Sequence, residues 1–166
     1  MLLVVARYVI VSDRSKVWIE ARSSVHPIHT ETDGLEGWLE IDGDRLVDGR
    51  LSLAVERLRS GNPLQDRELR RRIDAKRHPT IDGVASSITG GTDQGAVVVE
   101  GDLTFHGTTK RFDGDMRLEW LDEKTVRLTG EAHFDVRDFG MEPPKILMLK
   151  VDPVVGVRVE VIATQK

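Results

Sequence analysis

The chain has 166 residues, of which 39% are hydrophobic and 31% are charged, and this length fits one domain over residues 1–166. It carries 24 Lys and Arg against 28 Asp and Glu, and the formal charge of −4 argues against a general nucleic-acid binder, which normally has a basic surplus. It has no cysteine, which excludes disulfides, thiolate nucleophiles and Cys-ligated zinc.

The N-terminal segment is apolar from Met1 to Ala6 and is then interrupted by Arg7. A secretory signal peptide needs a basic start, a longer apolar core and a small-residue cleavage site, so we interpret this segment as the lead-in to a first strand. No apolar run in the chain approaches the roughly 18–20 residues of a membrane helix. We therefore expect a cytoplasmic protein without a membrane span.

Apolar and polar residues alternate along most of the chain, which is typical of strands with one buried and one exposed face. The alternating runs cover residues 17–22, 35–41, 51–56, 97–105, 112–120, 126–137 and 155–161. Turn-forming pairs such as Asp42-Gly43 and Asp48-Gly49 separate some of these runs. Long strands joined by short turns predict an all-β fold, with a single antiparallel β-barrel of about eight strands favoured over a sandwich.

The inward-facing side of these runs is almost entirely apolar. An apolar interior selects an apolar ligand, because a polar guest would lose its hydrogen bonds to water. Four inward positions are glycine, namely Gly37, Gly101, Gly114 and Gly130, which marks either strong coiling of the sheet or the close approach of a ligand or another backbone. The interior residues that we predict to contact a ligand are Val17, Ile19, Leu39, Leu53, Val55, Leu103, Phe105, Met116, Leu118, Phe134, Phe139, Met148, Val157 and Val159.

One segment breaks the two-residue period and predicts a helix over residues 63–77. Asn62 suits the N-cap, Pro63 suits the first helical position, and Leu64, Leu69 and Ile73 form the apolar stripe. Six cations follow on this helix: Arg67, Arg70, Arg71, Arg72, Lys76 and Arg77. They form either a solvated, partly ion-paired face or a site for a phosphate head group or an anionic membrane; in the second case the predicted head-group contacts are Arg70 and Arg71.

The sequence contains no recognisable catalytic or metal-binding motif. His26 and His29 are three residues apart in a predicted strand, where such residues face opposite sides, unlike the helical pair of a zinc enzyme. His106 falls at a predicted hairpin tip and His133 in the outward register. No serine lies in a Gly-x-Ser-x-Gly turn. We therefore predict no catalytic residue, no metal site and no cofactor.

Three stretches resemble the YceI-like family. Residues 62–81 resemble its helix that runs into a Pro-Thr-Ile segment, residues 101–110 its G-x-L-T-L/I-H-G-V-T-K hairpin, and residues 137–141 its R-S-D-F-G-M turn, here without the serine. The resemblance implies a lipocalin-like antiparallel barrel, mostly of eight strands, that binds a polyisoprenoid or related lipid and is not catalytic. Family members are often periplasmic or secreted and some form dimers, so a homodimer is a further expectation. The chain departs from the family in having Ile73-Asp74-Ala75 where paired phenylalanines usually follow the helix.

We therefore expect non-catalytic binding, storage or transport of a long apolar ligand: a polyisoprenoid, an isoprenoid quinone or a related lipid. The apolar run at residues 143–150 is flanked by prolines and lysines and is interpreted as a short helical lid over one mouth of the barrel, or as a plug. Two alternatives stay open. One is a small hydrolase or isomerase that uses His26, His106 or His133 with a carboxylate, and the other is a filled barrel that acts as an interaction or stress-response module.

Overall fold

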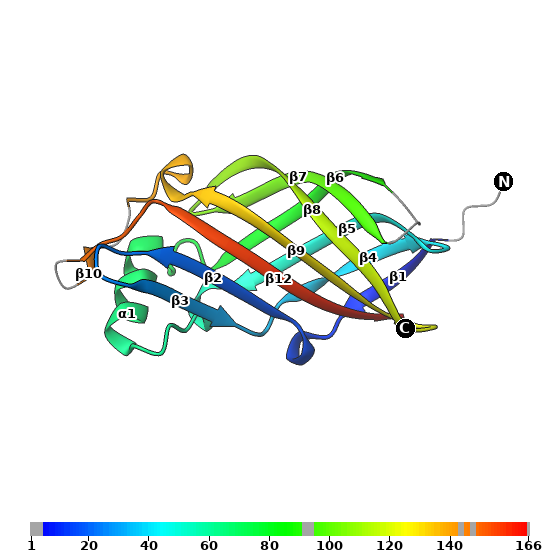
Figure 1. The fold of residues 1–166 in the computed structure, drawn as a ribbon, viewed down its shortest axis with the longest axis horizontal. Coiled ribbons are helices and arrows are strands. Elements are labelled where there is room, and N and C mark those ends of the chain that lie inside the picture. Colours follow the sequence, from blue (N-terminus) through cyan, green and yellow to red (C-terminus); the bar gives the residue numbers. More distant parts are fainter. Residues whose placement is uncertain (1–4, 91–94, 143–144, 147–148, 166) are drawn as a thin grey trace.

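Most of the chain is β-structure in the computed structural model, which describes residues 5–90, 95–142, 145–146 and 149–165 (Figure 1). The long strands are β1 (Val5–Ile10), β2 (Lys16–Arg22), β3 (Pro27–Thr32), β4 (Glu36–Asp42), β5 (Arg45–Ala54), β6 (Thr80–Gly90), β7 (Ala96–Phe105), β8 (Thr108–Asp122), β9 (Thr125–Asp135) and β12 (Val154–Gln165). The shorter elements are β10 (Lys145–Ile146), β11 (Leu149–Lys150), the helix α1 (Pro63–Ile73) and the 3-10 turns η1 (Ser12–Arg14), η2 (Val55–Arg57) and η3 (Val136–Phe139). No helix in this part of the chain has the length and apolar character needed to cross a bilayer.

Eight of the strands close into an antiparallel barrel, which confirms the predicted fold class. They follow one another around the ring in the order β1, β4, β5, β6, β7, β8, β9 and β12. The pairing of Tyr8 with Gln165 and of Ile10 with Ala163 joins the last strand to the first. Because side chains alternate along every strand, each run contributes one row to the interior and one row to the outer surface.

Two strands share one edge of β12. β1 pairs with β12 at residues 163–165, and β2 pairs with it at residues 156–160. Ser15 fixes the break between them, because its hydroxyl donates to the carbonyl of Val11 at 2.9 Å and accepts from the N–H of Ile162 at 3.0 Å. β3 pairs with β2 outside the ring, and its other edge makes one described bridge, from Glu31 to Arg59. Figure 1 shows α1 beside β2 and β3, at the end of the barrel away from the C-terminus.

The barrel is packed solid at the end away from α1. Leu39 and Ile41 of β4, Val126 of β9 and Val161 of β12 are at most 2% exposed. Burying an aliphatic side chain of this size stabilises the fold by about 1.5–3 kcal/mol. This half of the barrel is therefore an ordinary hydrophobic core.

The helix α1 begins where the sequence predicts and ends earlier. The side chain of Asn62 accepts hydrogen bonds from the N–H groups of Leu64 and Gln65 at 3.0 and 3.3 Å, as expected of an N-cap. Asp74 adopts a left-handed conformation with φ of 56°, and its N–H donates to the last carbonyls of the helix. The predicted boundary at residue 77 is therefore wrong, because this left-handed cap stops the helix at Ile73.

The predicted helical lid at residues 143–150 is also wrong where the chain is described. β10 and β11 pair as a short antiparallel ladder, with Lys145 opposite Lys150. The backbone beyond is held extended by the β2–β3 turn, since Ser24 N–H donates to the carbonyl of Lys150 at 2.8 Å and Ser23 bridges to Val151. Residues 143–144 and 147–148, including Met148, lie outside the described residues.

The solid half of the barrel should carry most of the stability. We expect Leu39→Ala to lower the free energy of unfolding by about 2–5 kcal/mol, because the surrounding strands cannot collapse into the space that it leaves. Leu103→Ala, at a half-buried position nearer α1, should cost clearly less. Urea denaturation of both variants measures the difference, and equal losses would contradict a division into two halves.

Candidate functional site

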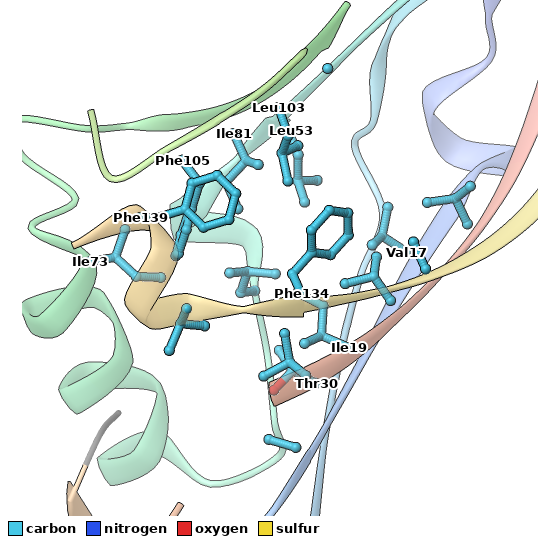
Figure 2. A pocket seen from close by; sticks show the side chains of 18 of the residues that line it. Val17, Ile19, Thr30, Leu53, Ile73, Ile81, Leu103, Phe105, Phe134 and Phe139 are labelled. Atoms are coloured by element: carbon cyan, nitrogen blue, oxygen red, sulfur yellow. The ribbon is translucent and has the colours of Figure 1, made fainter. Parts of the chain in front are cut away.

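A cavity of about 250 Å³ lies in the half of the barrel next to α1 and is partly open to solvent. Its walls come from β2, β3, β5 to β9 and β12, and one end is lined by α1, by the loop before α1 and by η3. Figure 2 shows Leu103, Phe105, Phe134 and Phe139 converging on this space. The lining is almost wholly apolar, so the cavity favours an apolar guest.

The change from solid core to cavity can be followed along single strands. On β7, Val97 and Val99 are buried, whereas Leu103 and Phe105 on the same face are half-buried because they border the cavity. On β8, Leu118 is buried, and Met116 and Phe112 are half-buried cavity residues. The interior is therefore neither filled throughout nor hollow throughout.

The inward glycines have two different roles. Gly37 and Gly101 lie where a side chain would run into the backbone carbonyls of Arg50 and Val84, so a close approach of neighbouring strands requires glycine there. Gly114 and Gly130 line the cavity. A Cβ at Gly114 would meet no atom within 4 Å, so this glycine leaves space open that a larger side chain would fill.

All four phenylalanines of the chain line the cavity. Phe105 and Phe139 meet edge to face with ring centroids 5.6 Å apart, and Phe134 lies 6.4 Å from both Phe112 and Phe139. Such contacts stabilise aromatic pairs beyond the area they bury. The cluster gives the cavity a rigid apolar wall built from β7, β8, β9 and η3.

The structure brings most of the predicted interior residues to this cavity. The residues that line it are Val17, Ile19, Leu53, Leu103, Phe105, Met116, Phe134, Phe139, Val157 and Val159. Leu39, Val55 and Leu118 are buried but do not line it, since they belong to the packed core. Ligand contact by any of these side chains stays a prediction.

Sequence reasoning missed a polar group at the α1 end of the cavity. Thr30, Ser60, Gln65 and Asp66 all line it. Asp66 is only 5% exposed, whereas Leu64, assigned above to the apolar stripe of the helix, is 62% exposed. The stripe prediction failed at Leu64 because the loop before α1 turns the first helical turn so that Asp66 faces inward. A carboxylate at the fourth position of a helix gives no sequence signal that separates this arrangement from a solvated one.

The cations of α1 are exposed or half-buried, and none of them lines the cavity. Arg71 is exposed and pairs with Glu68 at 3.1 Å, and Arg72 pairs with the same carboxylate at 2.9 Å. Hydrogen bonds from Arg71 and Arg72 hold the pKa of Glu68 below its usual value. Neither Arg70 nor Arg71 lines the cavity, so their contact with a ligand head group stays a prediction.

None of the five histidines, all of which the structure describes, lines the cavity. His106 occupies the β7–β8 hairpin tip with φ of 54°, its Nδ1 lies 3.1 Å from the carbonyl oxygen of Phe139, and its ring lies 5.4 Å from that of His78. It therefore helps to hold η3 against the hairpin. His26 and His29 are exposed, and the described residues contain no group of three or more His, Asp or Glu suited to a metal ion.

An eight-stranded barrel with an internal apolar cavity is the architecture of barrels that hold one small ligand. The model of the YceI-like domain matches residues 8–163, so the chain belongs to the YceI-like family. This family is generally a non-catalytic binding module. No curated protein matches the chain.

Three solved structures are similar in fold. Burkholderia cenocepacia BcnA matches with a TM-score of 0.82 and 17% identity, over 93% of this chain and 99% of that one. A polyisoprenoid binding domain from Saccharophagus degradans, implicated in plant cell wall breakdown, matches with a TM-score of 0.80 and 12% identity, over 96% and 98%. The Campylobacter jejuni YCEI protein matches with a TM-score of 0.69 and 16% identity, over 82% and 84%. At these identities the likeness shows a shared fold.

Filling the cavity should be possible without unfolding the protein. We expect Gly114→Leu to change the free energy of unfolding by less than about 1 kcal/mol, because the new side chain enters open space and does not overpack a core. The same variant should lose uptake of an apolar fluorescent dye. Asp113→Leu, at the exposed neighbouring position, is the control and should take up dye as the wild type does. Unchanged uptake by Gly114→Leu would show that dye binds elsewhere.

Proposed function

We propose that the protein binds, stores or transports a long apolar molecule in the barrel cavity, without catalysis. The ligand is a polyisoprenoid, an isoprenoid quinone or a related lipid. The observation that carries this proposal is the cavity lined by all four phenylalanines of the chain and by aliphatic side chains from most strands of the wall. Such a lining offers an apolar ligand dispersion and hydrophobic contacts along its length, and few hydrogen bonds.

Family membership supports the class of ligand. The chain belongs to the YceI-like family, and the Saccharophagus degradans domain of the same fold is a polyisoprenoid binding domain. The cavity of about 250 Å³ lies just below the range of about 300–1,000 Å³ found for small-molecule sites. We therefore expect affinity to rise with the number of isoprene units only until the cavity is filled.

The test is to weigh the natively purified protein as an intact complex, extract any lipid, and then add prenyl lipids of increasing length to the delipidated protein. We expect a reproducible excess mass that resolves into one class of prenyl chain, and uptake that Gly114→Leu abolishes and Asp113→Leu retains. The reason is that the side chain introduced by Gly114→Leu occupies the space that the lipid needs.

A bare polypeptide mass without uptake of any added prenyl lipid would contradict the proposal and favour an interaction module. Equal uptake by the wild type and Gly114→Leu would also contradict it, because the lipid would then bind outside the barrel.

A further inference from the structure

The cavity has a polar end built around the carboxylate of Asp66. Asp66 is 5% exposed, and its Oδ1 accepts hydrogen bonds from the backbone N–H of Ser60 at 2.8 Å and from the Ser60 hydroxyl at 2.7 Å. Both of these described hydrogen bonds end on the same oxygen. Asp66 lines the cavity, and no hydrogen bond to its Oδ2 is described.

Three segments converge to place this carboxylate. Asp66 lies in the first turn of α1, where its N–H donates to the carbonyl of the N-cap residue Asn62 at 3.0 Å and the positive end of the helix dipole favours an anion. The antiparallel bridge between Glu31 and Arg59 sets Thr30 opposite Ser60. Figure 2 shows Thr30 at the edge of the same pocket, below Ile19 and Phe134 in this view.

The polar end of the cavity is acidic, and no cation is described beside it. No described Lys, Arg or His forms an ion pair with Asp66, and none lines the cavity. The other charged lining residues, Glu131 and Asp152, are also acidic, although both are exposed. Buried charges are normally paired with a cation, whereas the described partners of Asp66 are the two hydrogen-bond donors of Ser60.

We propose that Asp66 makes this cavity select an apolar chain whose polar end donates a hydrogen bond, such as an alcohol, over a chain that ends in a phosphate. The inference rests on the proposed function and adds the head-group chemistry. A hydroxyl donates to the carboxylate of Asp66, with the Thr30 and Gln65 side chains beside it. A phosphate would bring a second negative charge close to this carboxylate, and no described cation lines the cavity to offset it.

The experiment is a competition between a polyprenol and the polyprenyl phosphate of the same chain length, mixed in equal amounts with the delipidated protein. Intact mass spectrometry then gives the ratio of the two complexes, which does not depend on the folded fraction. The wild type should favour the alcohol. Asp66→Asn should shift the ratio toward the phosphate by about tenfold or more, because removing one of two like charges relieves their repulsion.

Two further variants serve as controls. Glu68→Gln removes the same charge from the same helix, but at a residue that pairs with Arg71 and Arg72 and does not line the cavity, so it should leave the ratio unchanged. Ser60→Ala keeps the carboxylate and removes one of its donors, so the preference for the alcohol should be retained. This variant keeps the test informative if Asp66→Asn fails to fold.

Each outcome decides a different question. A wild type that binds the phosphate at least as well as the alcohol overturns the role of Asp66, and so does an Asp66→Asn ratio equal to that of Glu68→Gln. Loss of the alcohol preference in Ser60→Ala, where the charge is intact, would overturn it as well. A wild type that binds neither lipid contradicts the proposed function itself, so the two failures are distinguishable.

Discussion

The pairing of β12 with three neighbours is the constraint on which the rest of the structure depends. β9 runs along one edge of β12 without a break, from Val154 to Thr164, whereas β1 and β2 divide the other edge at Ser15. On the α1 side of this break β2 takes the place of β1 beside β12, and the outer edge of its partner β3 makes one described bridge, to Arg59. A loop and a helix must then complete the wall. Ser60, Gln65 and Asp66 thereby reach the cavity from outside the strands.

The two halves of the barrel have complementary energetic roles. An apolar cavity costs stability, because the side chains that surround it lose contacts that a packed core would supply. Leu39, Ile41, Val126 and Val161 make those contacts in the solid half. The solid half can therefore hold the wall in place while Leu103, Phe105 and Met116 keep part of their surface uncovered. A barrel that was hollow along its whole length would lack this support.

The fold could be predicted because alternation depends only on which face of a strand is buried, and that rule holds equally at Leu39 and at Phe134. The same rule cannot tell a packed position from a cavity position. Leu118 and Met116 are two residues apart on one face of β8, yet one is in the core and the other borders the cavity. That difference depends on what the other strands supply at the same level, including the absence of a side chain at Gly114. The helix end failed for a local reason, the left-handed cap at Asp74.

The charges of α1 show why the number of charges on a helix is a poor guide to its ligand. Six cations in residues 63–77 suggest an anionic partner, but Arg71 and Arg72 pair with Glu68, and none of these three lines the cavity. The one side chain of this helix that is both charged and buried against the cavity is Asp66. A ligand in the barrel interacts with that carboxylate across mostly apolar surroundings, which weaken the electrostatic interaction little. Its interaction with Arg71 and Arg72 is weakened by solvent and by their ion pairs with Glu68. The sign of the charge that a ligand meets is therefore set by which face of α1 the preceding loop turns inward.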